Sequence, residues 1–197
     1  SDELLLNILP AEVANELKES GKSTAKNYDM ATVLFADIKN FTGAAEKLTP
    51  DQLVAEIDYY FKNFDEIVGK YKIEKIKTIG DAYLCVGGLP KADIDNAYYV
   101  ISAALEMQDF VKRAKEQRIK SGTVYFDVRV GIHTGPLIAG IVGLRKFAYD
   151  IWGDTVNIAA RMEQHGEEGK INISGTTYEL VKGKFSCTYR GKIEAKN

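Results

Sequence analysis

Apolar and polar positions divide the first part of the chain into two short helical patterns and a polar stretch. Pro10 separates the two patterns and Gly21 ends the second, and the apolar positions are Leu5, Ile8, Leu9, Val13 and Leu17. The polar stretch 20–29 predicts a linker. A helix with an apolar stripe and no body of its own usually packs on a partner or on the domain behind it. We therefore interpret residues 1–28 as an N-terminal connector helix and linker, and the chain as a piece of a longer protein.

Residues 29–197 alternate between strand and helix patterns and form the second unit. Continuous or alternating apolar runs predict strands over 31–38, 124–135, 137–143 and 147–153, and the Gly-Asp turn in IKTIGDAYL predicts a hairpin over 76–84. The capping box TPDQ at 49–52 opens one helix, and further helical patterns cover 93–118 and 154–166. Strand, helix, paired strands, helix, strand is the split βαβ order of the ferredoxin-like motif. We expect an α+β fold with a mainly antiparallel sheet and flanking helices.

Composition narrows the class of protein without changing this fold prediction. The 197 residues are 45% hydrophobic and 27% charged with a formal net charge of −2, which indicates no surface for nucleic acid or for an anionic membrane. Cys85 and Cys187 match no metal spacing and no disulfide framework, which favours two reduced thiols. No apolar run reaches the roughly 18 residues that span a bilayer. We expect a cytoplasmic domain, within a full-length protein that could be membrane-anchored.

Two aspartates lie where predicted strands end. Asp37 ends the first strand before KNFTG leads into a helix, and Asp81 lies at the tip of the hairpin. If the two strands are neighbours, both carboxylates reach the same sheet edge and offer hard oxygen ligands to Mg²⁺ or Mn²⁺, with the backbone amides of 40–42 free to hold phosphates. Taken singly, each aspartate is more typical of a turn former or a helix cap.

Lys77 raises a second question about the hairpin. It lies four positions before Asp81 and carries the opposite charge. The two side chains could pair with each other, or each could serve a different partner, and the hairpin pattern leaves both possibilities open.

Four sequence blocks that occur together decide the role of the two aspartates and the partner of Lys77. FADIKNFT, EKIKTIGDAY, VRVGIHTG and YDIWGDTVNIAARM, in this order over about residues 30–196, closely resemble the catalytic domain of the class III nucleotide cyclases. The resemblance implies the class III cyclase fold and the cyclisation of a nucleoside triphosphate with loss of pyrophosphate. It also implies two Mg²⁺ or Mn²⁺ ions per active site, held by Asp37, Ile38 and Asp81, which bridge the triphosphate and activate the ribose 3′-hydroxyl.

The resemblance further implies a dimer in which two catalytic domains lie head to tail with substrate between them. In that arrangement Lys77 and Asp81 face different sites, so they should not pair. The metal, base and transition-state residues all occur in this one chain, which predicts a homodimer with two equivalent sites. An upstream sensory or regulatory domain would connect through the N-terminal helix.

The base can be predicted from hydrogen-bond chemistry. Lys77 is a donor only, and ionised Asp150 is an acceptor only. Lys77 toward N1 and Asp150 toward N6 fit adenine, whereas guanine presents the reverse pattern at N1 and O6. Guanylate cyclases of the family carry an acidic residue at the position of Lys77, as the resemblance implies. Without a nucleotide to read, Asp150 would be a solvated, outward-facing strand residue.

Two residues of the last predicted helix match the family's transition-state residues. Asn157 and Arg161 stand four apart, hence on one face of the helix. The resemblance implies that Asn157 positions the ribose and that Arg161 stabilises charge developing at the α-phosphate, a task that suits a permanently charged guanidinium. Asp154 beside them is interpreted as the helix N-cap.

The resemblance also implies the remaining phosphate contacts. Phe41 and Thr42 lie at the helix start that would hold phosphates, and Arg129 and Lys196 match positions that contact the β- and γ-phosphates. Family members usually continue beyond the position of Lys196 into a last strand, which would be truncated here. His133 is interpreted as a packed strand histidine.

Our interpretation is an adenylate cyclase catalytic domain over residues 29–197 that binds ATP and forms 3′,5′-cyclic AMP and pyrophosphate. One alternative is a guanylate cyclase, which Lys77 and Asp150 oppose. The other is a catalytically silent cyclase-like module for nucleotide binding or dimerisation. Such modules typically lose a metal aspartate or the arginine, and this chain keeps both.

Overall fold

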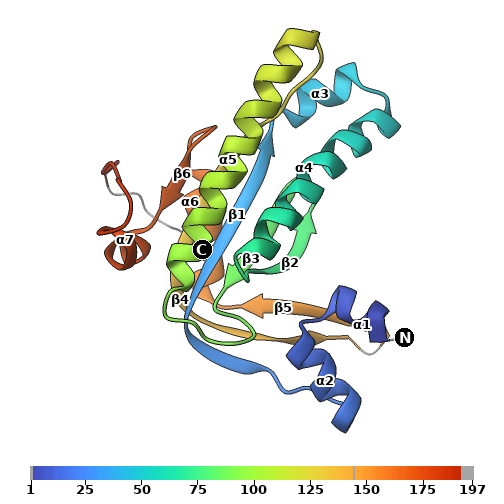
Figure 1. The fold of residues 1–197 in the computed structure, drawn as a ribbon, viewed down its shortest axis with the longest axis vertical. Helices are drawn as coiled ribbons and strands as arrows, with labels where there is room; N and C mark the ends of the chain where they lie inside the picture. Colours follow the sequence, from blue (N-terminus) through green and yellow to red (C-terminus); the bar gives the residue numbers. More distant parts are fainter. Residues whose placement is uncertain (1, 144, 192–197) are drawn as a thin grey trace.

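The computed structural model describes residues 2–143 and 145–191 as a mostly antiparallel sheet with flanking helices (Figure 1). The strands follow the order β2-β3-β1-β4-β5, and β6 pairs with β4 in parallel. The strands are β1 (Lys26–Lys39), β2 (Glu74–Ile79), β3 (Ala82–Gly87), β4 (Asp127–Val142), β5 (Ala148–Trp152) and β6 (Ile171–Ile173). The helices are α1 (Asp2–Ile8), α2 (Ala11–Ser20), α3 (Phe41–Lys47), α4 (Pro50–Lys70), α5 (Asn96–Ser121), α6 (Asp154–Gln164) and α7 (Gly175–Val181). The expected α+β class is confirmed.

The two faces of the sheet bury different apolar clusters. Alternation along β1 sends Leu34, Ala36 and Ile38 to the face that α4 and α5 cover, which we call the α4–α5 face. Val33 and Phe35 point to the opposite face, where α6 and the N-terminal helices pack, and we call this the α6 face. Figure 1 shows α4 and α5 running side by side over one face of the sheet. Because Asp37 continues the alternation of Val33 and Phe35, its side chain lies on the α6 face.

β4 is longer than the sequence predicts. The runs 124–135 and 137–143 are not two strands; the strand begins at Asp127 and continues to Val142. Pro136 has no N–H for the ladder, but it lies between the β4 partners of Tyr28 and Ala31, where β1 carries a bulge. The hydrogen bond that Pro136 cannot donate is therefore missing at a point where the pairing of β1 and β4 is already irregular. β4 continues as one strand on both sides of Pro136.

The start of β1 also differs from the predicted linker. Residues 26–29 belong to the strand, because 26–28 pair with Leu137, Ile138 and Ala139 of the extended β4. Leu9, Val13 and Ala14 of the N-terminal segment are buried in the cluster on the α6 face. The connector thus packs on the domain behind it, and the division at residue 28 stays a prediction.

Helix ends follow the sequence signals at α4 and α2 but not at α6. Thr49 and Gln52 form the predicted capping box of α4, and Gly21 ends α2 in the left-handed conformation. The interpretation of Asp154 as an N-cap is wrong, because Gly153 occupies the cap at φ 139° and α6 begins at Asp154 itself. The predicted helices 93–118 and 154–166 become 96–121 and 154–164.

β2 and β5 approach each other although they stand at opposite ends of the strand order. β3 pairs with β1 over 32–37, whereas β5 pairs with the far end of β4 over 138–142. The sheet therefore coils, and Leu84 and Val86 of β3 share the cluster on the α6 face with Tyr149 and Ile151 of β5. This coiling closes the sheet around the cluster.

Glu74 of β2 lies where β2 approaches β5. It is near enough to Tyr149 for the charge of the Glu74 carboxylate to raise the pKa of the tyrosine. Burial raises the pKa of the Glu74 carboxyl itself from 4.5 to about 7. The folded chain therefore binds this proton more tightly than the unfolded chain does. The stability that depends on the neutral carboxyl is present below pH 4.5 and is lost as the pH rises through about 7.

We expect Glu74→Gln to raise the free energy of unfolding by about 2 kcal/mol at pH 8 and to change it little at pH 4. Glutamine mimics the neutral acid, so the gain should follow the ionisation of Glu74. Urea unfolding at the two pH values measures the difference, with Glu116→Gln on the exposed surface of α5 as the control. An equal effect at both pH values would contradict the assignment.

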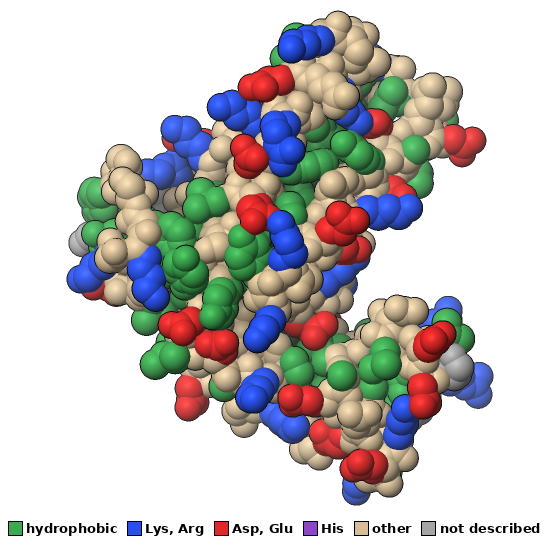
Figure 2. Space-filling view, viewed as in Figure 1, with side chains coloured by type: hydrophobic (Ala, Val, Ile, Leu, Met, Phe, Trp, Pro, Cys, Tyr) green, Lys and Arg blue, Asp and Glu red, His purple; other side chains and the backbone are tan. Residues whose placement is uncertain are grey.

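The described part of the chain offers no membrane span, and the face in Figure 2 shows little charge segregation. No helix within 2–143 and 145–191 is long and apolar enough to cross a bilayer. Figure 2 shows acidic and basic side chains interspersed over the visible face, which agrees with the net charge of −2.

Candidate functional site

Strand pairing brings Asp37 and Asp81 together at one edge of the sheet. Asp37 lies near the end of β1, with Ala82 as its Cα partner in β3. The N–H of Ile38 donates to the carbonyl oxygen of Asp81 at 2.9 Å. Asp81 itself occupies the turn between β2 and β3. Both carboxylates therefore emerge at the same edge of the sheet, as the sequence predicts.

The two carboxylates disturb each other electrostatically. Burial, and next the negative charge of Asp37, raise the pKa of Asp81. A cation between two such groups removes their repulsion, so the donor set fits a divalent ion. The Ile38 side chain is buried and apolar, which leaves only its backbone carbonyl as a ligand. N–H and C=O of one residue in a strand point the same way, so this carbonyl faces the side of Asp81.

The aspartate pair does not make a complete metal cage. Within residues 2–143 and 145–191, no group of three or more His, Cys, Asp and Glu side chains is arranged to hold a metal ion. Mg²⁺ takes six oxygen ligands and commonly binds through one or two carboxylates together with water and substrate phosphates. This pair therefore fits a cation whose remaining ligands are water or substrate phosphates.

Basic side chains surround Asp37. Lys39 Nζ lies 3.4 Å from Asp37 Oδ2, and Arg129 Nη2 lies 4.0 Å from the same oxygen. Arg129 Nε also donates to Glu163 Oε2 at 2.9 Å. Arg129 thus lies beside the aspartates, where a phosphate group bound with a cation would be within its reach. We call Asp37, Asp81 and Arg129 the metal half-site.

Gly131 explains how α6 comes so close to this half-site. A Cβ atom at Gly131 would lie 1.9 Å from the backbone nitrogen of Glu163. Only glycine therefore allows α6 to rest directly on β4. The close approach places the Glu163 side chain, 8% exposed, against Arg129.

Sequence reasoning missed Glu163 and Lys39. A signal for Glu163 existed, because Thr155, Ala159, Met162 and Glu163 form an i, i+4, i+7, i+8 stripe, and all four are buried. A carboxylate within such a stripe needs a partner. Lys39 is an ordinary charge after a strand, and nothing in the sequence distinguishes it.

The Lys77 and Asp150 side chains meet across the closure of the sheet. Lys77 Nζ lies 2.8 Å from Asp150 Oδ2, and Asp150 Oδ1 accepts the N–H of Ile151 at 2.8 Å. Lys77 therefore pairs with Asp150 and not with Asp81. The Asp150 side chain is only 19% exposed, so it is not a solvated outward residue.

Asn157 and Arg161 lie on α6, one turn apart. Asn157 is exposed and Arg161 is half-buried, and Arg161 Nη1 donates to Gln164 Oε1 at 2.8 Å. The family resemblance assigns Asn157, Arg161 and the Lys77–Asp150 pair to the same half of an active site, and we call these four residues the base half-site.

Three predicted phosphate contacts lie wholly or partly outside the part of the chain that the structure describes. Phe41 and Thr42 form the start of α3, where the first amides have no intrahelical partner, but their side chains lie outside the described residues. Lys196 also lies outside them.

His133 is buried as expected, and its Nδ1 hydrogen-bonds Ser174 Oγ at 2.6 Å.

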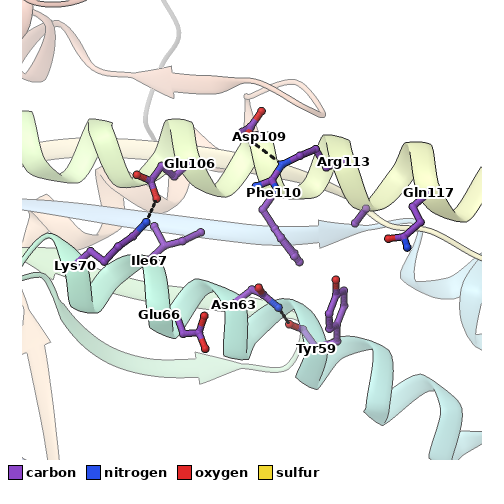
Figure 3. A pocket seen from close by; sticks show the side chains of 11 residues that line it. Tyr59, Asn63, Glu66, Ile67, Lys70, Glu106, Asp109, Phe110, Arg113 and Gln117 are labelled. Atoms are coloured by element: carbon purple, nitrogen blue, oxygen red, sulfur yellow. Dashed lines mark hydrogen bonds and ion pairs between the residues drawn. The ribbon is translucent and has the colours of Figure 1, made fainter.

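A groove of about 760 Å³ lies on the outer side of α4 and α5. Figure 3 shows its lining, in which Lys70 of α4 pairs with Glu106 of α5 at 2.6 Å. None of the candidate residues above contributes to this lining. The groove is therefore separate from both half-sites.

Comparison with known sequences agrees with the sequence blocks. The family model described as the adenylate and guanylate cyclase catalytic domain matches residues 23–197. An adenylate cyclase of Mycobacterium tuberculosis is 41% identical over 197 residues, which is 100% of this chain and 44% of that protein. The guanylate cyclase soluble subunit beta-2 of Rattus norvegicus is 39% identical over 197 residues, 100% of this chain and 28% of that protein. The chain spans less than half the length of either relative.

Solved structures share the fold. The adenylyl cyclase CyaB from P. aeruginosa has a TM-score of 0.82 and 30% identity, and the match covers 87% of this chain and 89% of that one. The catalytic core of a rhodopsin–guanylyl cyclase with converted specificity, in complex with ATPαS, has a TM-score of 0.76 and 35% identity over 83% of this chain and 87% of that one. Together with the family match over 23–197, these relatives confirm the resemblance, and the chain belongs to the family of adenylate and guanylate cyclase catalytic domains.

Proposed function

We propose that this domain is the catalytic part of an adenylate cyclase that converts ATP to 3′,5′-cyclic AMP and pyrophosphate. The observation that carries the proposal is the 2.8 Å contact between Lys77 Nζ and Asp150 Oδ2. It holds a donor-only and an acceptor-only group side by side, which matches the N1 acceptor and the N6 donor of adenine. Relatives named as adenylate and as guanylate cyclases are almost equally similar to the chain. Lys77 and Asp150 therefore distinguish an adenylate cyclase from a guanylate cyclase better than overall sequence identity does.

The metal half-site would hold the cations. Asp37, Asp81 and the carbonyl of Ile38 are the proposed ligands of two Mg²⁺ or Mn²⁺ ions, with the phosphate oxygens of ATP completing the shell. Such ions, when bound, offset the charge of the triphosphate and lower the pKa of the ribose 3′-hydroxyl. Arg129, held at the edge of this half-site, would bind the β- and γ-phosphates. The amides of Phe41 and Thr42 at the start of α3 and the Lys196 ammonium would add phosphate contacts.

The base half-site would hold the rest of the nucleotide. Lys77 and Asp150 orient adenine, Asn157 orients the ribose, and the permanent charge of Arg161 stabilises the negative charge that develops at the α-phosphate. A silent module is disfavoured, because the metal aspartates and the arginine of α6 are all present.

We infer that each active site combines the metal half-site of one chain with the base half-site of a second copy, as in the head-to-tail dimers of the family. Exposed apolar side chains lie beside Lys77 and Asp150 of the base half-site, and they support the inference that a second copy of the chain packs there. They are Ile79 of β2, Ile138 and Val142 of β4, and Trp152 of β5. An upstream regulatory domain joined through α1 and α2, and a cytoplasmic location, stay predictions.

Turnover of ATP and GTP in Mn²⁺ tests the proposed function. We expect cyclic AMP from ATP and far less cyclic GMP from GTP. A preference for GTP would favour a guanylate cyclase, and a lack of turnover with both nucleotides would favour a silent module.

A further inference from the structure

Arg129 lies between two carboxylates that belong to different elements. Its Nε donates to Glu163 Oε2 of α6 at 2.9 Å, while its Nη2 lies 4.0 Å from Asp37 Oδ2 of β1. The first contact is a charge-assisted hydrogen bond, and the second is longer than one. The guanidinium is thus bound to Glu163 and only approaches Asp37.

Glu163 has little freedom to leave this position. A Cβ atom at Gly131 would lie only 1.9 Å from the Glu163 backbone nitrogen, so α6 is in direct contact with β4 at this residue. The side chain is 8% exposed and Arg129 is 22% exposed. A buried carboxylate that pairs with one arginine so closely fixes the direction of that arginine.

The Asp37 carboxylate is the group for which Arg129 and a cation would compete. A guanidinium that moved fully onto Asp37 would occupy the oxygens offered to the metal ion. Lys39 already lies 3.4 Å from Asp37 Oδ2, so a second cationic side chain there would compete further.

We propose that Glu163 is a positioning residue that holds Arg129 away from Asp37, so that Asp37 stays available to a divalent cation and the outer nitrogens of Arg129 stay available to phosphate. This role rests on the proposed function, in which Asp37 is a metal ligand. Glu163 touches neither substrate nor cation in this account, because it acts through Arg129.

Mn²⁺ binding to the full chain tests the role without relying on turnover. The loss of the free Mn²⁺ signal in electron paramagnetic resonance gives the dissociation constant for Mn²⁺ alone. We expect Glu163→Gln to raise this constant about tenfold, the size typical of changes next to a metal ligand. Glutamine keeps the shape of the side chain but removes the charge that holds Arg129.

A double variant separates positioning from a merely structural role. Glu163→Gln combined with Arg129→Gln should bind Mn²⁺ about as tightly as the wild type, since no guanidinium is left to occupy Asp37. Arg129→Gln alone should bind Mn²⁺ at least as tightly as the wild type, and it provides the same test if Glu163→Gln does not fold. General damage to the fold would weaken binding in all three variants.

A matched control breaks an ion pair elsewhere. Arg118 and Glu56 form two hydrogen bonds of 3.0 Å between α5 and α4, and both side chains are partly buried. Glu56→Gln should lower the melting temperature without changing the dissociation constant for Mn²⁺.

Two outcomes would overturn the proposal in different ways. Unchanged Mn²⁺ binding in a folded Glu163→Gln variant, or no rescue in the double variant, would refute the role of Glu163 and leave the proposed metal half-site intact. An absence of Mn²⁺ binding in the wild type would refute this inference, and if Mn²⁺-dependent turnover is absent as well, it would also refute the proposed function.

Discussion

Asp37→Ala and Asp81→Ala should each abolish cyclase turnover, with a loss of about a thousandfold or more. Metal ions in such displacements contribute several kcal/mol to transition-state stabilisation, and each 1.36 kcal/mol is about tenfold in rate. The two aspartates meet at one sheet edge, and no set of three metal-binding side chains elsewhere in the described part of the chain could replace them. Production of cyclic AMP from ATP in saturating Mn²⁺ measures the effect.

The same variants should keep the fold. The charge of Asp37 is one cause of the raised pKa of Asp81, so removal of either carboxylate relieves repulsion in the metal-free chain. Asp81→Ala should therefore have a melting temperature equal to or above that of the wild type, whereas Asp37→Ala also loses its contacts to Lys39 and Arg129 and should stay close to the wild type. Asp58→Ala, at an exposed ion pair with Lys62 on α4, is the control and should keep full activity. Near-normal turnover in either active-site variant would refute the metal assignment.

The second large effect concerns the base. Lys77→Glu combined with Asp150→Cys exchanges a donor for an acceptor at N1 and removes the charged acceptor from N6. Guanine N1–H would then meet a carboxylate, and its O6 would no longer face one. A mismatched buried polar group costs about 1–3 kcal/mol, so two reversed contacts should shift selectivity by roughly two orders of magnitude.

The ratio of kcat/KM for GTP to that for ATP, before and after the change, measures this shift. Both residues should change together, because Lys77 and Asp150 form one ion pair at 2.8 Å and Lys77→Glu alone would place two carboxylates side by side. Activity with GTP is therefore compared with activity with ATP on the same double variant. An unchanged ratio would mean that Lys77 and Asp150 do not read the base.

Local signals predicted most of the helices and strands, and the errors arose at strand limits that depend on the pairing partner. The capping box at 49–52 acts within a few residues, so its sequence suffices. Residues 26–29 are polar and carry no strand pattern, yet they pair with β4. Pro136 looks like a strand end, and only the bulge opposite it in β1 shows why β4 continues.

The metal half-site could be predicted better than the base half-site. Asp37 and Asp81 each lie at a strand end, and sheet pairing alone brings such positions together. The contact between Lys77 and Asp150 joins strands at opposite ends of the strand order, so it depends on the coiling of the whole sheet. Glu163 lies on the apolar stripe of α6, but its pairing with Arg129 depends on the helix contact that Gly131 permits.

Complementation of two inactive chains tests the central claim most directly, namely that each chain carries half of two different active sites. Asp81→Ala damages only the metal half-site and Arg161→Ala only the base half-site, so a mixed dimer should contain one intact site. In an equal mixture about half of the dimers are mixed, and we predict recovery of roughly a quarter of the wild-type activity. Labelled chains must show that subunits exchange. No recovery of activity despite exchange would contradict the shared-site arrangement.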